Sequence, residues 1–502
     1  MTEVQRWAHP WIRVGTERPV EGTPSARCGE AAHLGENMAP GGLFLEWHWN
    51  GSTLSARNDR YGIYPAFIAQ LPDGIALSPD LLKLLEIGAP RDLDPTAIAA
   101  FLRTGYFLGD DTPFRHIRAL GPGTNLRWTA QEGLTITSGE PECRSNDWTF
   151  DQAAKTWGPM FREAMRRRPP LPGKTMLPLS GGRDSRFILL ELLALGHPVV
   201  GLTTNKQPPY PTNDVPAAFA IAKRTGIEHH LIESGEDIFW TERTKNLRTG
   251  LCAEEGGYMV PLCEVISQQA KTTYDGFLGD VLTGVRFFED GEVEMVRQAR
   301  LDEVAERMVS YREHQLQRTL SPEAYRMFSR EAGMQRIREA LALQADKPNP
   351  IGSFLTWNRS RREVATQTLA LVRPDVLVYF PYLDADLFDA YMGLPAELLL
   401  SGDLTVAGLH LAHPDFADVP FEKAFRDATP KRPRHPSLAR YGRSMLQALR
   451  RRRYTWIDSA NAARDARVMA LTGFRMHHRN RQILSYMMDL EEWAAGEDAG
   501  AA

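Results

Sequence analysis

The stretch 176–187 combines glycine, serine and aspartate in a pattern that suits phosphate chemistry. Its opening apolar run leads into Ser180, Gly181 and Gly182, and a second apolar segment with helical periodicity follows. Glycines let a backbone approach an anion closely, and the amides at a helix start attract negative charge with the helix dipole behind them. Asp184 adds a carboxylate where a magnesium ion would bridge phosphates. The pattern therefore predicts a strand, a phosphate-binding loop and a helix.

The order Ser-Gly-Gly-Arg-Asp-Ser at 180–185 resembles the pyrophosphate loop of the ATP pyrophosphatases. Members of that superfamily split ATP between its α and β phosphates to adenylate a carbonyl or carboxylate oxygen. Within it, the rest of this chain is similar to the asparagine synthetase family. The residues 173–175, Gly-Lys-Thr, also suggest a Walker A loop, but that motif needs a glycine where this chain has Arg168. An ordinary connection between strand and helix is the alternative for the bare glycine turn.

A second turn, Gly-Phe-Leu-Gly-Asp at 276–280, resembles the Gly-x-Gly-Ser-Asp turn of the same family. In the family the aspartate of this turn holds the other side of the magnesium ion, so the resemblance implies Asp184 and Asp280 as metal ligands. It implies ATP and Mg²⁺ as cofactors. The residues expected to contact the nucleotide are Ser180, Gly181, Gly182, Asp184, Ser185 and Gly279. As alternatives, Asp184 would cap a helix and Asp280 would belong to an ordinary turn.

The second turn departs from the family at Phe277. Asparagine synthetases have a glutamate at this position and β-lactam synthetases have a tyrosine, whereas a phenylalanine ring cannot take a proton. The usual acid or base is therefore missing. Glu254 and Glu255, which precede the turn in the chain, are two candidate replacements.

Four cationic side chains are candidates for contacts with phosphate or with the transition state. Arg183 and Arg186 flank the first aspartate and would clamp phosphate or a substrate carboxylate, or else be solvent-exposed helix arginines. Lys423 lies roughly where related enzymes place a transition-state lysine, and Lys431 is the reserve candidate. A solvated surface lysine is the alternative for both. We predict Lys423 and Arg183 as the catalytic cations.

The segment 42–124 resembles the later part of the glutaminase domain of asparagine synthetases, with its motifs in the same order. A working glutaminase of this type needs a cysteine as its mature N-terminal residue. Here Thr2 holds that position, and about forty residues precede the matching segment, too few for the family's opening strands. We therefore expect a truncated, structural domain that does not make ammonia. The alternative is that Thr2 is an N-terminal nucleophile.

The 502 residues predict two domains. Residues 1–145 are β-rich, with apolar runs at 43–49 and 63–69, and are expected to form a degenerate glutaminase-like (Ntn-type) domain. Residues 150–490 are expected to form an asparagine synthetase-like ATP-pyrophosphatase domain. The predicted class is α/β: a β-rich, truncated Ntn-type domain is followed by a parallel-sheet domain of the adenine nucleotide α hydrolase-like kind, with a helical C-terminal part.

Helical periods in the second half alternate with short apolar runs that predict parallel strands at 175–179, 199–203 and 273–278. A helix is predicted at 185–195. After residue 284 the chain is mostly helical, and the Ala/Gly/acidic end at 494–502 is predicted to fray.

The composition of the chain limits the kinds of binding partner and the cellular compartment that we expect. A net charge of −4 argues against nucleic acid as the main partner. The four cysteines lie far apart without Cys-x-x-Cys spacing, which disfavours zinc and disulfides and fits a reducing cytoplasm. No apolar stretch is long enough for a bilayer, and the first residues do not open a signal peptide, so we expect a cytoplasmic protein without a membrane partner.

These features predict an asparagine synthetase-like ligase without its own glutaminase activity. ATP would adenylate a small-molecule or peptide carboxylate, and an amine would attack the acyl-adenylate to form an amide. Intramolecular closure, as in β-lactam synthetases and lasso peptide cyclases, stays open, as does a homodimer. The alternatives are a degenerate nucleotide-binding scaffold or regulator and, third, transfer to a nucleic acid base. The arginine-rich segment 431–453 is either a solvated helix face or a docking site for an acidic substrate, peptide or carrier.

Overall fold

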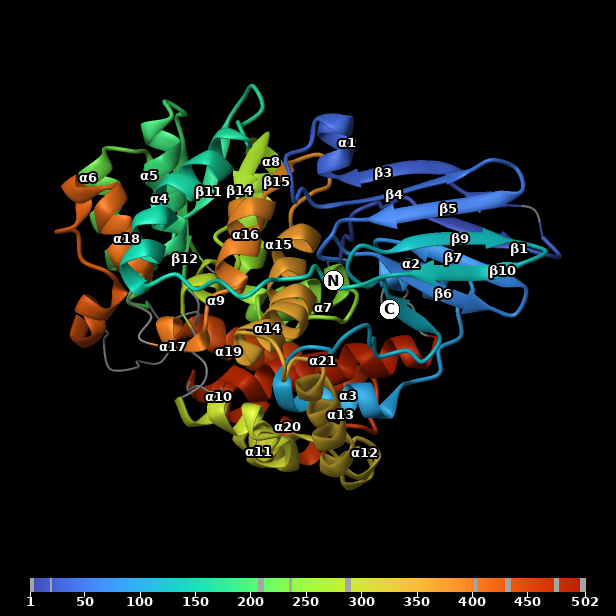
Figure 1. Ribbon diagram of the computed structural model, residues 1–502. Coiled ribbons are helices and arrows are strands. Elements are labelled where there is room, and N and C mark those ends of the chain that lie inside the picture. Colours follow the sequence, from blue (N-terminus) through green and yellow to red (C-terminus); the bar gives the residue numbers. More distant parts are fainter. Residues whose placement is uncertain are drawn as a thin grey trace.

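The computed structural model contains antiparallel sheets in its N-terminal part, a parallel sheet in the middle and a helical C-terminal part (Figure 1). The mixed α/β class expected from the sequence is confirmed at this level. The residues that the structure describes are 4–18, 20–205, 212–233, 237–284, 290–400, 404–428, 435–473 and 478–496.

Two five-stranded antiparallel sheets form the N-terminal part. The first has the order β2-β1-β7-β6-β8, with β1 (Ile12–Gly15), β2 (Glu21–Gly22), β6 (Phe67–Leu71), β7 (Gly74–Ser78) and β8 (Ile117–Ala119). The second has the order β10-β9-β5-β4-β3, with β3 (Ser25–Gly29), β4 (Phe44–Trp49), β5 (Thr53–Asn58), β9 (Asn125–Thr129) and β10 (Gly133–Thr137).

Alternation along the strands places the core between these two sheets. In β4, Leu45 and Trp47 are buried, whereas Glu46 is half-buried and His48 is exposed. Leu45 and Trp47 join one apolar cluster with Ile12 and Val14 of the facing sheet. The first sheet is covered on its other side, because Phe67 and Ala69 of β6 and Ala76 of β7 belong to a second cluster that contains α2 and α3.

Three short strands, β1 to β3, form within the first forty residues, and whether this part is a truncated glutaminase-like domain stays a prediction. One expectation for this part was wrong in detail. The run 63–69 becomes a strand only from Phe67, because the buried Asp59 carboxylate accepts the amides of Tyr61, Ile63 and Tyr64 and holds them in a loop. Thr2 lies outside the described residues.

The third sheet is parallel throughout, with the order β13-β12-β11-β14-β15. Two of the three predicted strands are confirmed to within one residue at each end, and the third is shorter than predicted. It stops at Tyr274 because the Asp275 carboxylate accepts the Phe277 amide and turns the chain, and Leu278 then adopts a left-handed conformation with φ of 73°. The strands are β11 (Thr175–Pro178), β12 (Val200–Thr204), β13 (His229–Ile232), β14 (Thr272–Tyr274) and β15 (Leu377–Tyr379).

Helices make up most of the chain beyond β14 (Figure 1). The α-helices up to β14 are α1 (Glu30–Leu34), α2 (Leu81–Glu86), α3 (Pro95–Thr104), α4 (Phe150–Arg166), α5 (Asp184–Ala194), α6 (Asp214–Thr225), α7 (Ile238–Arg248) and α8 (Val260–Gln269). Those beyond it are α9 (Gly279–Thr283), α10 (Asp290–Arg297), α11 (Leu301–Thr319), α12 (Pro322–Met327), α13 (Arg330–Ala342), α14 (Pro350–Leu355), α15 (Ala365–Leu371), α16 (Ala385–Met392), α17 (Ala396–Leu399), α18 (Leu404–Ala412), α19 (Pro436–Arg451), α20 (Ser459–Thr472) and α21 (His478–Ala494).

One π-helix and several 3-10 helices complete the backbone. The π-helix is η3 (Thr356–Val364), and the 3-10 helices are η1 (Gly35–Asn37), η2 (Gly257–Met259), η4 (Pro381–Leu383), η5 (Pro414–Phe416) and η6 (Glu422–Ala428). The predicted helix 185–195 is confirmed as α5. Among the described residues, no helix combines the length and the apolar content that crossing a bilayer requires.

Buried arginines connect the N-terminal part to the rest of the chain. Arg361 of η3 donates to the carbonyls of Gly62, Gly109 and Leu120 at 2.7–3.2 Å. Its partners all lie in the first 145 residues, so the two predicted domains share a polar, buried contact. The boundary near residue 145 itself stays a prediction.

Arg168, just after α4, makes a second such connection. Its side chain is fully buried, and it donates to the Asp384 carboxylate at 2.8 Å and to the Pro40 carbonyl at 2.8 Å. Asp384 is itself buried and also pairs with Arg167. A guanidinium satisfies several acceptors at once, so one residue joins segments more than a hundred positions apart.

We predict that Arg168→Ala lowers the free energy of unfolding by about 3 kcal/mol, because it leaves the Asp384 charge buried with a weaker partner. Arg166→Ala is the matched control, since Arg166 is exposed and its ion pair with Glu163 spans 3.7 Å. The control should change stability by less than about 0.5 kcal/mol. Urea unfolding followed by circular dichroism measures both, and equal effects would show that the buried contact is not a main source of stability.

Candidate nucleotide-binding site

The predicted phosphate loop and the second turn leave neighbouring strands at the same edge of the parallel sheet. From β11 the chain runs to β12 and β13 on one side, then returns to β14 on the other side of β11. The connections after β11 and β14 therefore diverge from their carboxyl ends. In open parallel sheets this point of divergence forms the crevice in which ligands bind.

The two predicted aspartate turns touch each other in this crevice. A β-carbon added at Gly279 would lie 2.6 Å from Asp184 Oδ1 and 3.0 Å from the Tyr382 ring. One added at Gly276 would lie 3.1 Å from the Asp184 β-carbon. The approach at Gly279 leaves no room for a side chain and that at Gly276 is tight, so these two positions bring the turn that carries Asp280 against Asp184. Tyr382 donates to the Asp184 carbonyl at 3.0 Å and fixes the start of α5.

The loop between β11 and α5 is held by hydrogen bonds from its own amides. The Ser180 amide donates to the Ser185 hydroxyl at 3.1 Å. The Gly182 amide donates to the Ser180 hydroxyl, also at 3.1 Å. The Gly181 amide donates to Asp214 Oδ1, also at 3.1 Å. A phosphate bound here would have to replace these partners. The pairing of the loop with Asp214, which begins α6, was not recognised from the sequence.

A cavity of about 270 Å³ opens beside the loop and the turn. One part of its lining is polar and acidic, and the other part is apolar and includes Leu202, Met259, Leu262 and Val364. A cavity with both parts suits a ligand that is charged at one end and flat and apolar at the other. The charged lining residues are Asp184, Asp214, Asp275, Asp280 and Arg359.

The aspartate pair fits a magnesium ion bound together with phosphates. Among the described residues, no group of three or more His, Cys, Asp or Glu side chains converges as a ligand set. Magnesium needs no such set, because it is usually held by one or two carboxylates plus substrate phosphates and water. Asp184 and Asp280, at one cavity, meet that requirement.

Phe277 and Asp275 give the second turn its shape, and the Phe277 ring offers no proton acceptor. Phe277 is 5% exposed, and its ring packs edge-on against Phe380 with centroids 5.7 Å apart. Asp275 accepts the Phe277 amide at 2.9 Å and the Thr368 hydroxyl, so both of its oxygens are engaged. Burial raises the pKa of Asp275.

A carboxylate that the sequence analysis did not single out lies beside the cavity. The π-helix η3 lines the cavity with Arg359, Ser360 and Val364 and buries Glu363. The Glu255 amide donates to Glu363 Oε1 at 3.2 Å. Burial, followed by the charge of Glu255, raises the pKa of Glu363 to about 8, although Arg359 opposes the shift.

Of the two proton acceptors considered from the sequence, only Glu255 joins this group. Glu254 is buried and forms an ion pair with Arg312, which is also buried. The signal that could have identified Glu363 is its place as the one acidic residue after three arginines, in Arg-Ser-Arg-Arg-Glu at 359–363. That signal alone does not reveal burial.

Arg186 is neither a phosphate clamp nor a solvent-exposed arginine. It is fully buried and donates to the carbonyls of Val419 at 2.7 Å and Pro420 at 2.8 Å. Its guanidinium carbon also lies 3.9 Å from the centroid of the Phe421 ring. Arg186 therefore binds the segment 419–421 to α5, next to the predicted phosphate loop.

This attachment brings the predicted lysine to the loop. The Glu422 amide donates to the Gly181 carbonyl at 3.2 Å. Exposed Lys423 lines a second, smaller cavity of about 230 Å³ together with Gly182 and Arg183. Lys423 and Arg183 thus meet at the glycine loop, in a cavity separate from the one that holds the aspartates. Lys431 lies outside the described residues.

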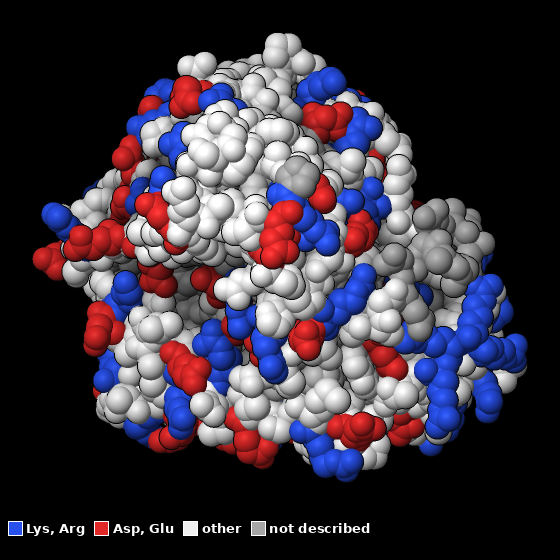
Figure 2. Space-filling model, turned by 90° about the vertical axis from the view of Figure 1, so that its right-hand side faces the viewer, with Lys and Arg blue, Asp and Glu red and all other residues white. Residues whose placement is uncertain are grey.

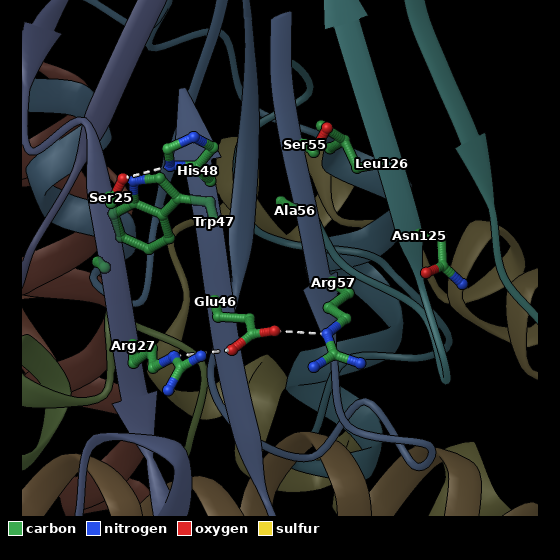
Figure 3. Close-up of a pocket in the computed structure, with 11 residues that line it drawn as sticks. Ser25, Arg27, Glu46, Trp47, His48, Ser55, Ala56, Arg57, Asn125 and Leu126 are labelled. Atoms are coloured by element: carbon green, nitrogen blue, oxygen red, sulfur yellow. Dashed lines mark hydrogen bonds and ion pairs between the residues drawn. The ribbon is translucent and has the colours of Figure 1, made fainter. Parts of the chain in front are cut away.

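A larger hollow, about 750 Å³, lies on the outward side of the second N-terminal sheet (Figure 3). There Glu46 lies between Arg27 and Arg57, at 3.4 and 2.5 Å, and His48 contacts Ser25 at 2.7 Å. These side chains point from neighbouring strands and satisfy one another. The hollow is a polar sheet face, and none of the predicted site residues lines it.

Comparisons with known proteins add little to this geometry. No protein-family model matches the chain. No curated protein matches it either. Among solved structures, one similarity is to the glutamine phosphoribosylpyrophosphate (PRPP) amidotransferase from B. subtilis complexed with ADP and GMP, at 14% identity and a TM-score of 0.14, covering 49% of this chain and 44% of that one. The chain thus spans less than half the length of that protein, and a likeness of this size carries no argument about fold or function.

We predict that Arg186→Gln loosens the segment 419–424 without unfolding the protein. Hydrogen exchange should become at least about 10-fold faster at its backbone amides, because two donors and a stacked ring are lost together. Arg224→Gln is the matched control: Arg224 also donates to a backbone carbonyl, that of Asp415, and lies over the Phe416 ring, but it is exposed. Equal exchange in both variants would contradict the assigned role of Arg186.

Proposed function

We propose that this protein is a magnesium-dependent ligase that activates a carboxylate with ATP and joins it to an amine, with AMP and pyrophosphate as products. The observation that carries the proposal is the contact between the Gly279 backbone and the Asp184 carboxyl, which brings Asp184 and Asp280 to one cavity that Ser180 of the glycine loop also lines. Two carboxylates and a loop of backbone amides are the groups that bind a magnesium triphosphate.

In the first step, a carboxylate oxygen of the substrate attacks the α phosphorus, and the bond to the pyrophosphate oxygen breaks. Asp184 and Asp280 would hold Mg²⁺, which gathers the phosphate oxygens and offsets the charge of the leaving group. Leu202, Met259 and Leu262 offer an apolar surface for the adenine ring. The product of this step is an acyl-adenylate.

In the second step, the amine attacks the carbonyl carbon, AMP leaves, and the amine loses a proton. Phe277 cannot accept that proton, so we assign it to the pair that buried Glu363 forms with half-buried Glu255 beside the cavity. Lys423 and Arg183, at the glycine loop, would offset the charge of the departing phosphate. The same steps apply whether the carboxylate and the amine belong to one molecule or to two.

The direct test is product identity. The purified protein, given Mg²⁺, α-labelled ATP and a panel of amino acids and of short peptides with Asp or Glu side chains, should release labelled AMP with at least one of them. Asp184→Asn and Asp280→Asn should each lower turnover by at least about 10-fold while leaving the circular dichroism spectrum unchanged. The exposed Asp415→Asn is the control. Release of labelled ADP instead of AMP would reject adenylation.

A pH profile tests the assigned proton acceptor. Glu363 accepts a proton only when deprotonated, so amide formation should rise with pH through about 8 and then level off. Glu363→Gln should remove this rise and slow amide formation by roughly 10²-fold, because general base catalysis is lost. Titration of the substrate amine affects both proteins equally and cancels in the comparison. An unchanged profile in the variant would refute the assignment, whereas exchange of pyrophosphate into ATP should be unaffected by it.

A second candidate function is nucleotide binding without ligation. Two observations favour it: Phe277 stands where a proton acceptor would be useful, and the Gly181 amide is already bound by Asp214. This candidate predicts that the magnesium complex of α,β-methylene-ATP binds and stabilises the protein while no carboxylate in the panel yields AMP. The ligase proposal requires both binding and turnover.

A further inference from the structure

The helix α19 has one apolar and one strongly basic side. Leu438, Tyr441 and Met445 are buried and attach the helix to the core. The opposite side carries exposed Arg443, Arg450 and Arg451, and the helix contains no acidic residue. Positions 443, 450 and 451 fall on one face, because seven or eight residues make two helical turns.

The helix α20 packs directly against α19 and also exposes basic side chains. Gly442 allows α19 and α20 to approach backbone to backbone, since a β-carbon there would collide with the Ala466 carbonyl. The exposed residues of α20 include Arg464 and Arg467 together with two apolar side chains, Val468 at 49% and Leu471 at 87% exposure. We call the exposed side chains of Arg443, Arg450, Arg451, Arg453, Arg464, Arg467, Val468 and Leu471 the α19–α20 surface.

The charge of this surface is not neutralised locally. In the parts of the chain that the structure describes, five of its arginines form neither an ion pair nor a side-chain hydrogen bond: Arg443, Arg450, Arg451, Arg453 and Arg467. Nearby acids have other partners. Asp465 binds Arg318, Glu491 accepts the Thr455 amide, and Glu492 binds Arg243 and the Tyr454 hydroxyl. Figure 2 shows one such gathering of Lys and Arg at the lower right of its face, with few acidic side chains among them.

We propose that the α19–α20 surface is a docking site for an acidic polypeptide segment that also carries apolar side chains. Arginine forks match carboxylates in geometry and charge, and unpaired exposed arginines lose little by binding them. The apolar part of the site is Leu471, whose 87% exposure is unusual for a leucine, with Val468 one turn away. Such a partner places carboxylates on the arginines and an apolar side chain on Leu471.

Two other anionic partners fit the surface less well. Single-stranded nucleic acid needs exposed aromatic rings for stacking, and the exposed large apolar residues of α19 and α20 are Val468 and Leu471, neither of them aromatic. A lipid surface is bound by a helix that inserts its apolar side, but the apolar side of α19 is buried in the protein core. An acidic polypeptide is therefore the partner that charge and apolar exposure jointly favour.

This docking does not depend on the proposed ligase reaction, because it needs neither ATP nor the cavity residues. The experiment measures fluorescence anisotropy of a labelled peptide built from Glu and Leu, titrated with the full chain at low and at physiological ionic strength. A matching peptide of Lys and Leu is the charge control. Binding of the acidic peptide should weaken as salt rises.

The decisive variant replaces Arg443, Arg450, Arg451 and Arg453 by Gln. We expect it to weaken binding about 10-fold with unchanged thermal melting. The control variant replaces four other exposed arginines, which lie outside this surface, by Gln: Arg27, Arg57, Arg127 and Arg166. It removes the same charge and should change binding less than about 2-fold. Leu471→Ala should weaken binding about 3-fold, which reports the apolar part.

Three outcomes would overturn the inference. Equal weakening by the two four-residue variants would mean that only net charge matters and that no site exists. An unchanged affinity in Leu471→Ala would remove the apolar contact from the proposal. Tighter binding of poly-uridine RNA or of phosphatidylserine vesicles, lost in the same four-residue variant, would assign the surface to a different partner.

Discussion

The central constraint in this molecule is the absence of side chains at Gly276 and Gly279. Because neither has a β-carbon, the turn after β14 presses against Asp184 at the start of α5. That contact closes the crevice which the strand order opens between β11 and β14. The cavity, its acidic lining and the position of Asp280 all follow from it. A larger residue at Gly279 would collide with the Asp184 carboxyl, and one at Gly276 would require its neighbours to shift by a few tenths of an ångström.

Buried arginines fix the segments around this crevice. Arg186 binds the backbone of 419–420, Arg361 binds three carbonyls of the N-terminal part, and Arg168 joins Asp384 to Pro40. In each case the partners include carbonyls of segments distant in sequence. A buried guanidinium group is suited to loop segments, because the backbone carbonyls of a loop have no hydrogen-bond partner in a strand or helix. The loops at the site therefore owe their placement to polar contacts as much as to apolar packing.

The aspartate-lined cavity and the α19–α20 surface carry opposite charge. The cavity gathers four carboxylates around one arginine, which suits a cation bound with a polyphosphate. The α19–α20 surface gathers arginines without acids, which suits an acidic partner. Between these extremes, Glu363 is a carboxylate that burial keeps protonated up to about pH 8. It lies on the π-helix that lines the same cavity as Phe277, whose ring cannot take a proton.

The sequence alone determined the local features. It identified β11, β12 and α5 nearly to the residue, because apolar runs and periodicity depend on neighbours in the chain. It also singled out both aspartate turns, through their resemblance to the turns of a known family. The roles and proton chemistry proposed for these turns remain hypotheses that rest on their geometry.

Only the tertiary structure decided which side chains are buried and which partners they meet. Arg186 reads from the sequence like its neighbour Arg183, yet one is buried against Val419 and Pro420 and the other lines a cavity with Lys423. In the sequence, nothing distinguishes Glu363 from other helix glutamates. In the folded protein, burial raises its pKa. The strands within the first forty residues were missed because they are short and are stabilised by pairing with distant strands. Burial and pairing are set by contacts between residues far apart in the chain, which no local pattern encodes.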